Sequence, residues 1–186
     1  MLEQVILWRK IDSPGHDACG LWSVVGGWRL AGAATFLAEG QPCLLQYQVE
    51  CDSFWRTRAA TVEGWMGSAE ARLAIVADAG ERWRMNGVEH PELAGLVDID
   101  LGFTPATNLL QLRRLSLRVG QGAEAPTAYL AFPELTLRKL EHRYQRVAED
   151  AYDYEAPCFG YAARLQVSEL GFVTHYPGLW EVETRR

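Results

Sequence analysis

Apolar and polar residues alternate in short segments along nearly the whole chain. Alternation with a period of two is typical of strands that have one buried and one exposed face. Turn residues separate many segments at spacings of roughly 8–12 residues, which is typical of an antiparallel all-β domain. The pattern predicts strands at Val5–Ile11, Gly20–Val25, Trp28–Phe36, Cys43–Cys51, Thr57–Trp65, Ala71–Ala77, Glu81–Met85, Leu96–Leu101, Leu115–Val119, Ala128–Phe132, Leu135–Val147, Phe159–Val167 and Gly171–Tyr176.

One stretch, Pro105–Arg113, departs from this alternation and predicts a helix. Thr104 precedes Pro105, the order expected of an N-cap followed by the first helical residue. After the helix the apolar residues alternate again, so we expect a strand at Leu115–Val119. The segment Glu134–Arg146 fits either a helix or a strand, and its β-rich surroundings favour a strand.

Length and composition bound the architecture. The 186 residues show no linker, repeat or low-complexity run, so we expect a single domain over residues 1–186. Hydrophobic residues make up 48% and charged residues 23%, which is ordinary for a globular protein and excludes wholesale disorder. The most apolar stretch, Leu21–Ala38, contains Arg29 and the pair Gly26-Gly27, which predicts two buried strands rather than a membrane span.

The net charge and the spacing of the cysteines and histidines limit the classes of ligand and cofactor that we expect. The net charge of −6 argues against nucleic-acid binding, because such proteins normally carry a basic face. The four cysteines lack CxxC spacing and the four histidines lack ligand spacing, so we expect no metal and no cofactor. Cys43 and Cys51 fall on one extended segment, where a separation of roughly 26 Å excludes a disulfide. No signal peptide is evident, and we expect a cytoplasmic protein with four buried free thiols.

Two carboxylates are candidates for an acid/base pair. Asp98 and Asp100 alternate with apolar residues, so both should project from one strand face, about 7 Å apart. That spacing falls within the range used for acid/base glycoside chemistry. A solvent-facing pair, or a pair bonded to Arg113 or Arg114, is the commoner arrangement. No nucleophile elbow, phosphate-binding loop or HExxH motif accompanies the pair, so we assign no catalytic residue.

Aromatic residues give a second signal. Four of the seven tryptophans have an arginine neighbour, and on a strand the indole then faces inward while the guanidinium faces water. Such indoles either fill a β core or line a cavity for a sugar or a lipid. His142 and Tyr144 would share one face of a strand. Tyr176 and Trp180 flank a turn near the chain end, which suits either a pocket wall or a dimer contact.

Four segments resemble the bacterial family described as "Putative glycolipid-binding": WRKIDSPGHD, QYQVECDSFWRTR, VDIDLGFTPATNLLQLRRLSL and GFVTHYPGLW. They follow the same order over essentially the whole chain. Two positions depart from the family pattern, since Asp17 stands where Glu is usual and Gln111 where Pro is frequent. Gln111 should let the helix continue further. The resemblance implies a spiral β-roll, in which antiparallel strands wrap around a single helix matching Pro105–Arg113, and it implies a homodimer. It attaches no catalytic residues.

Three functions follow as alternatives. The first is a non-catalytic protein that binds a glycolipid or another amphipathic molecule, with the apolar tail in a groove of the roll. The second is a structural or interaction protein with a filled core, in which an Arg–Asp cluster locks the helix to the sheet. The third is a small-sugar hydrolase or isomerase that uses Asp98 and Asp100. For the first, the candidate ligand-binding residues are Asp98, Asp100, Asn108, Arg113, Arg114, Tyr144, Tyr176 and Trp180.

Overall fold

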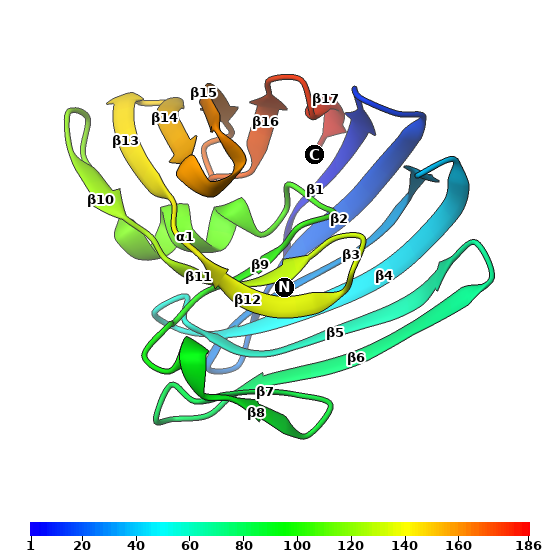
Figure 1. Ribbon diagram of the computed structural model, residues 1–186. Coiled ribbons are helices and arrows are strands. Elements are labelled where there is room, and N and C mark those ends of the chain that lie inside the picture. The colour runs from blue at the N-terminus through cyan, green and yellow to red at the C-terminus, as the bar shows by residue number, and fades with distance from the viewer.

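Antiparallel strands make up most of the structure, a computed structural model that describes all residues 1–186 (Figure 1). One large sheet has 14 strands in the order β10-β13-β14-β15-β16-β17-β1-β2-β3-β4-β5-β6-β7-β8. Its strands are β1 (Leu2–Lys10), β2 (Gly15–Val24), β3 (Gly27–Ala38), β4 (Gln41–Asp52), β5 (Thr57–Met66), β6 (Ala69–Ala77), β7 (Trp83–Met85), β8 (Val88–His90), β10 (Gly122–Glu124), β13 (Arg143–Ala148), β14 (Ala151–Ala156), β15 (Tyr161–Val167), β16 (Val173–Tyr176) and β17 (Trp180–Arg185).

A small sheet and one helix complete the fold. The small sheet has the order β12-β11-β9, in which β11 runs antiparallel to β12 and parallel to β9. Its strands are β9 (Ile99–Leu101), β11 (Thr127–Ala131) and β12 (Thr136–Leu140). The helices are α1 (Asn108–Leu115) and the short 3-10 helices η1 (Pro91–Leu93) and η2 (Pro157–Phe159). None of the helices is long and apolar enough to cross a membrane.

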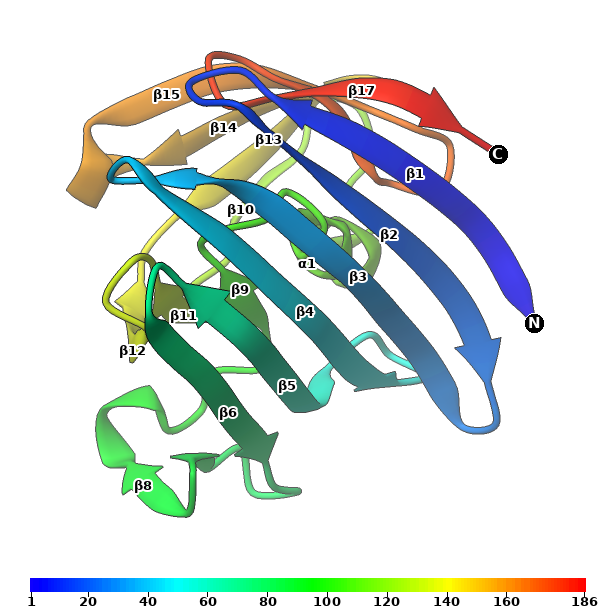
Figure 2. The same ribbon diagram turned by 90° about the vertical axis from the view of Figure 1, so that its right-hand side faces the viewer.

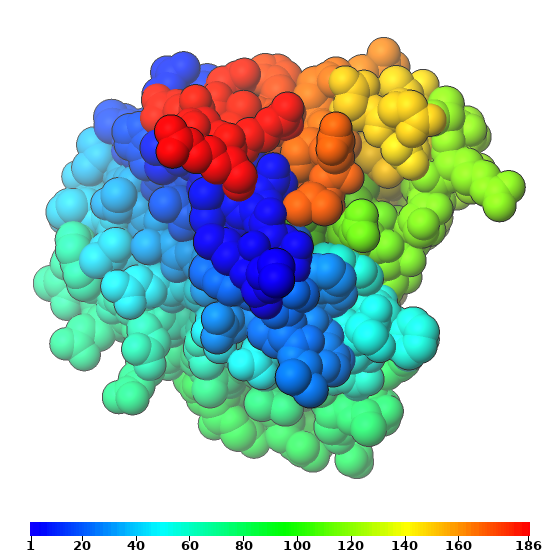
Figure 3. Space-filling view, turned by 180° about the vertical axis from the view of Figure 1, so that it is seen from behind, coloured from blue at the N-terminus to red at the C-terminus, as the bar shows by residue number.

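The large sheet curls around the other elements. Figures 1 and 2 show α1 and the small sheet inside its concave face, with β1–β6 on one side and β13–β17 on the other. Strand β1 pairs with β17, so the two ends of the chain lie side by side, as seen from behind in Figure 3. The expected architecture, an antiparallel sheet wrapped around one helix, is therefore confirmed.

The long strands follow the alternating pattern that predicts them. On β4, every second residue faces the core and is buried: Cys43, Leu45, Tyr47, Val49 and Cys51. The apolar stretch Leu21–Ala38 forms the end of β2 and the whole of β3, with a tight turn between Val24 and Gly27. Gly26 occupies that turn with a φ of 83°, a left-handed conformation that glycine adopts without strain. The prediction of two strands in this stretch is confirmed.

The predicted helix exists but begins and ends later than Pro105–Arg113. Thr104, the expected N-cap, lies in the turn before α1, where its hydroxyl accepts a hydrogen bond from the Ala106 backbone N–H at 3.0 Å. Thr107 occupies the N-cap position but makes no side-chain capping bond, and its hydroxyl donates to Asp100 instead. The helix continues past Gln111 to Leu115, as expected for a glutamine in place of a proline.

The strand predicted at Leu115–Val119 is wrong. Leu115 is the last residue of α1, and Ser116 ends the helix in a left-handed conformation with a φ of 46°. Leu117 is buried, but its carbonyl accepts a hydrogen bond from Arg146 Nη1 at 2.9 Å instead of pairing with a neighbouring strand. The alternation after the helix therefore reflects one buried leucine in an irregular segment.

The single strand predicted at Leu135–Val147 is also wrong. It splits into β12 and β13, which belong to different sheets, because β12 pairs with β11 and β13 pairs with β10 and β14. The chain passes from the small sheet to the large sheet at Glu141 and His142.

Four strands were not predicted from the sequence: β8, β10, β14 and β17. The expectation of four buried thiols is wrong for one of them, because Cys158 is exposed while the other three cysteines are buried.

Core filling, one of the two roles expected of the tryptophans with an arginine neighbour, is clearest for two of them. Trp8 and Trp83 are fully buried, and each indole N–H donates to a backbone carbonyl, at Val173 (2.6 Å) and Leu96 (2.8 Å) respectively. Burying these large rings with their single donor satisfied stabilises the roll without leaving an unpaired polar atom. The main core contains 33 buried residues, including Leu109 of α1.

Replacing Leu109 by alanine should lower the free energy of unfolding by about 2–5 kcal/mol, because the cavity left in a packed core cannot fully close. Leu109 is 0% exposed, whereas Leu2, a matched control, is 50% exposed. Leu2→Ala should change the same quantity by less than about 0.5 kcal/mol. Urea unfolding of both variants measures the difference, and equal small effects would contradict the central position of α1.

Candidate functional site

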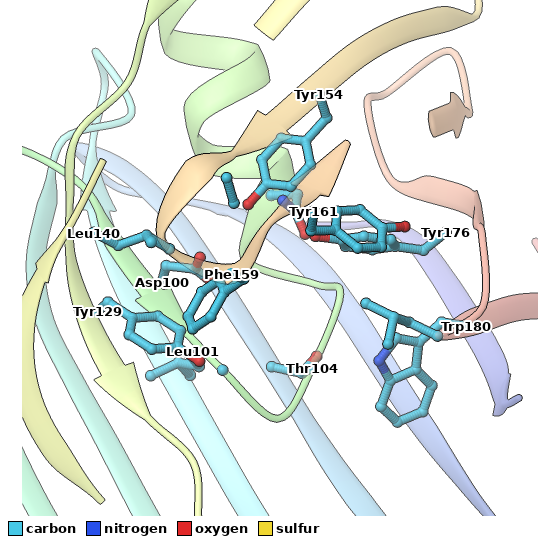
Figure 4. Close-up of a pocket in the computed structure, with 14 residues that line it drawn as sticks. Asp100, Leu101, Thr104, Tyr129, Leu140, Tyr154, Phe159, Tyr161, Tyr176 and Trp180 are labelled. Atoms are coloured by element: carbon cyan, nitrogen blue, oxygen red, sulfur yellow. The ribbon is translucent and has the colours of Figure 1, made fainter. Parts of the chain in front are cut away.

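A cavity of about 280 Å³ opens between the small sheet, the loop before α1 and the last strands of the large sheet (Figure 4). Ligand cavities in proteins usually measure ~300–1,000 Å³, so this one suits a small group. Its wall is mostly apolar and aromatic, with a few polar side chains. The lining residues are Asp100, Leu101, Gly102, Thr104, Asn108, Tyr129, Leu140, Tyr154, Ala156, Phe159, Tyr161, Tyr176, Leu179 and Trp180. We call this space the tyrosine cavity.

Strand pairing brings these residues together from distant parts of the chain. The parallel register of β9 and β11 places Asp100 beside Tyr129. The antiparallel register of β16 and β17 places Tyr176 opposite Trp180. Figure 4 shows Tyr129 and Asp100 on one side of the space and Tyr176 and Trp180 on the other. The cavity therefore depends on both sheets keeping their register.

Asp100 is the only ionisable carboxylate in the lining. The Thr107 hydroxyl donates to its Oδ1 at 3.0 Å, and no group of the chain donates to its other oxygen. Burial raises the pKa of Asp100 to about 6, because an apolar surrounding disfavours the charged form. At neutral pH the cavity thus holds a carboxylate with a vacant acceptor oxygen. Such a group favours a ligand that brings hydroxyl donors.

Tyrosines form much of the aromatic wall. The Tyr154 ring centroid lies 5.9 Å from that of Tyr176 and 6.2 Å from that of Tyr161. Burial raises the pKa of Tyr154 and of Tyr176, so both hydroxyls stay protonated. The Tyr161 hydroxyl donates to the Pro177 carbonyl at 2.7 Å, which holds the β16–β17 turn against β15. The wall combines flat apolar faces with neutral hydroxyl groups.

A buried polar layer supports this wall from behind. Asn108 at the start of α1 lines the cavity, and its Nδ2 donates to the Tyr144 hydroxyl at 2.7 Å. His142 Nδ1 lies 3.1 Å from the Tyr154 hydroxyl. Burial lowers the pKa of His142 to about 4, so its ring is neutral at physiological pH. His142 and Tyr144 are both buried and their rings lie 5.4 Å apart, so the two residues do lie on one side of the segment.

Asp98 has a different environment from Asp100. Arg114 donates to it through Nε, to Oδ1 at 2.9 Å, and through Nη2, to Oδ2 at 2.6 Å. The Asp98 side chain is 0% exposed and that of Arg114 is 22% exposed. Burial raises the pKa of Asp98, and the neighbouring Arg114 only partly counters that effect. The two carboxylates do not share a cavity, so they are not arranged as a catalytic dyad.

The eight predicted site residues thus separate into three groups. Asp100, Asn108, Tyr176 and Trp180 line the tyrosine cavity. Tyr144 lies behind it, against Asn108. Asp98, Arg113 and Arg114 lie outside the lining, with Asp98 bonded to Arg114 and the Arg113 guanidinium 5.2 Å from the centre of the Trp55 ring.

Sequence reasoning missed several residues of the cavity. Tyr129, Tyr154, Phe159 and Tyr161 line it, and none of them carries a recognisable local motif. The alternation of Tyr152 and Tyr154 in AYDYEA is a signal that could have identified β14 and its aromatic face. No group of three or more His, Cys, Asp or Glu residues is arranged to hold a metal ion.

Asp17, one of the two positions where the chain departs from the family pattern, contacts a residue that lines the cavity. It is completely buried, and it accepts hydrogen bonds from the hydroxyls of Tyr47, at 3.0 and 3.1 Å, and Thr104. Burial raises the pKa of Asp17 to about 7, while these two donors favour the charged form. Because Thr104 lines the cavity, Asp17 anchors one part of its wall to the large sheet.

A sheet wrapped around one helix, with an aromatic cavity at the helix start, defines the protein as a β-roll. The sequence matches the family described as "Putative glycolipid-binding" over residues 5–182, and the chain belongs to that family. A crystal structure of a DUF1089 family protein from Pseudomonas aeruginosa is similar, with 30% identity and a TM-score of 0.79 over 89% of this chain and 91% of that chain.

A more distant structure shares the fold alone. It is a β-barrel-like protein of the domain of unknown function DUF1849 from Brucella abortus, with 9% identity and a TM-score of 0.57 over 99% of this chain and 96% of that chain. No protein with a curated description matches the sequence. The likeness of fold therefore agrees with the β-roll, while any function has to be argued from the site.

Replacing Arg114 by methionine should lower the free energy of unfolding by about 3–5 kcal/mol, because it leaves the buried Asp98 carboxylate without a partner. The double variant Asp98→Asn/Arg114→Met should recover part of that loss. Arg164→Met is a matched control, since Arg164 pairs with Asp153 on the exposed surface, and its stability should change little. Chemical unfolding of the four proteins measures this, and a loss in Arg114→Met no larger than in the control would contradict a structural ion pair.

Proposed function

We propose that the protein binds, without catalysis, the sugar headgroup of an amphipathic molecule such as a glycolipid in the tyrosine cavity. The observation that carries the proposal is Asp100, a buried carboxylate with a vacant acceptor oxygen on an aromatic wall. Sugars present hydroxyl donors around a ring whose C–H faces pack on aromatic side chains. A cavity of about 280 Å³ is of a size for one such ring rather than for a whole lipid.

Each lining group has a role in this proposal. Asp100 accepts hydrogen bonds from one or two sugar hydroxyls, and the side-chain amide of Asn108 adds a further polar contact. Tyr161 and Trp180 lie on the side of the cavity opposite Asp100 and provide aromatic faces (Figure 4). Four of the predicted binding residues line the cavity and contact the sugar in this proposal: Asp100, Asn108, Tyr176 and Trp180. Tyr144 acts by holding Asn108.

The alternatives have less support. The hydrolase alternative needs two carboxylates at one ligand, and Asp98 is bonded to Arg114 away from the cavity. The structural alternative explains the ion pair between Asp98 and Arg114 well, but leaves unexplained a buried carboxylate that lines a cavity.

We further propose that the protein acts in the cytoplasm as a homodimer. Sedimentation velocity would test the dimer. The headgroup is bound by one chain alone in this proposal.

Replacing Asp100 by asparagine should weaken the binding of a sugar at least tenfold, because a charged acceptor makes hydrogen bonds worth about 1.5–3 kcal/mol. Asparagine keeps the shape and can still accept from Thr107. Calorimetric titration with the methyl β-D-glycosides of glucose, galactose and mannose measures the affinity. Asp153→Asn, a change of the same kind at the exposed partner of Arg164, should bind as the original protein does. Equal affinities in the two variants would contradict the proposal.

Sugar affinity should also fall as the pH falls through about 6. The pKa of Asp100 is raised to about 6, so the free carboxylate is mostly ionised at pH 7.5 and mostly protonated at pH 5. A protonated carboxyl accepts fewer hydrogen bonds, and we expect about tenfold weaker binding at pH 5. Titrations across this range should show a clear slope in the original protein and a much smaller one in Asp100→Asn, where Asp17, with a pKa of about 7, still titrates in contact with Thr104. Equal slopes in the two proteins, or a flat profile in both, would exclude Asp100 as the titrating acceptor.

A further inference from the structure

A second cavity adjoins the tyrosine cavity. It measures about 380 Å³, and Gly102, Leu179 and Trp180 line both spaces. The shared residues make the two cavities neighbours across a narrow divide. We call the second space the phenylalanine groove.

The inner wall of the groove is aromatic and lacks tyrosine hydroxyls. The Phe132 ring centroid lies 5.4 Å from that of Phe36 and 6.1 Å from that of Phe103. Phe36 also lies 6.3 Å from the Trp180 ring, which connects this wall to the divide. Phe132 itself is half-buried and lines this groove but not the tyrosine cavity. The three phenylalanine rings suit a hydrocarbon, and Ser13, whose buried hydroxyl has no hydrogen-bond partner, is the one uncharged polar side chain of the lining.

The charges at the groove do not select a charged ligand. Lys10 forms an ion pair with Asp12, and its Nζ lies 5.6 Å from the Phe36 ring centroid and 5.2 Å from that of Trp180. Glu39 is a further acidic residue in the lining. Because the one cation already has a carboxylate partner and two aromatic faces, an anionic group would gain little there and would meet the acidic residues.

One of the three residues shared by the two cavities, Gly102, has no side chain. Gly102 is exposed, and a Cβ at this position would lie 2.4 Å from the Tyr129 hydroxyl. A side chain at this position would therefore clash with Tyr129 or obstruct the passage between the two cavities. Glycine leaves that passage open.

We propose that the phenylalanine groove holds the first part of the hydrocarbon chain of the molecule whose sugar occupies the tyrosine cavity. The proposal rests on the proposed function, and it adds where the apolar part lies. The bond between sugar and chain crosses the divide at Gly102. The polar and apolar halves of one ligand then match the polar and apolar characters of the two neighbouring spaces.

Paired glycosides test this assignment. The methyl and octyl β-D-glycosides of glucose, galactose and mannose are titrated below the concentrations at which the octyl compounds form micelles. For the sugar that binds, the octyl compound should bind about 10- to 100-fold more tightly than the methyl compound, because part of its chain leaves water. Phe132→Gln should reduce that ratio at least threefold and leave the affinity for the methyl compound unchanged. Because Phe132 is half-buried, circular dichroism of the variant checks that it folds as the original protein does.

Leu2→Gln is the matched control. Leu2 is 50% exposed on β1 and lines neither cavity, so both affinities should stay as in the original protein. If the methyl and octyl compounds bind equally well, or if the octyl advantage survives in Phe132→Gln, the groove is not the chain site and the inference is wrong while the proposed function stands. If none of the six glycosides binds the original protein, the proposed function itself is overturned.

Discussion

Every residue of the segment Asp98–Gln111 except Gly102 is buried inside the roll, so most of its polar groups need hydrogen-bond partners within the chain. An unpaired buried polar group costs about 1–3 kcal/mol, so this requirement constrains all neighbouring elements. The Ile99 N–H donates to the Thr57 hydroxyl at 3.1 Å, and Gln111 Nε2 donates to the Ile99 carbonyl at 3.0 Å. The Leu101 N–H donates to the Thr107 hydroxyl at 3.1 Å. These bonds tie β9, α1 and the large sheet into one arrangement.

The same constraint separates the roles of the three buried carboxylates. Asp98 is held by Arg114, and Asp17 is held by two hydroxyls, so both are occupied by the fold itself. Asp100 has a single internal donor, Thr107, and lines a cavity. A stability role thus accounts for two of the carboxylates, while the third has a vacant acceptor oxygen. The binding proposal depends on this difference and not on the number of acidic residues.

Much of the fold could be predicted from local pattern. A long strand such as β4 has one buried face over many residues, so its alternation is clear in the sequence. The strand prediction at Leu115–Val119 is wrong because its apolar residues alternate without forming a strand. Leu115 ends the helix, Ser116 is left-handed, and only one leucine of the segment is buried. The single strand predicted at Leu135–Val147 is wrong because the chain leaves the small sheet and enters the large one at Glu141 and His142. The break depends on pairing with β11 and β14, which local sequence does not show.

The site was less predictable than the fold. Asp100, Asn108, Tyr176 and Trp180 belong to segments that carry the family resemblance, and they do line the cavity. Asp98 and Asp100 looked equivalent because sequence spacing cannot show that Arg114 reaches only Asp98. The tyrosines of β11, β14 and β15 reach the cavity only through the closure of the roll, which depends on pairings between residues far apart in the chain.

Native mass spectrometry, followed by organic extraction of the bound material, tests the central claim most directly. The original protein and Asp100→Asn would each be purified without detergent and compared at the same concentration. Our account predicts one glycosylated amphiphile per chain on the original protein, and a clear loss of that adduct in Asp100→Asn. A bare protein that stays bare after incubation with glycolipids, or an adduct retained equally by both proteins, would contradict it.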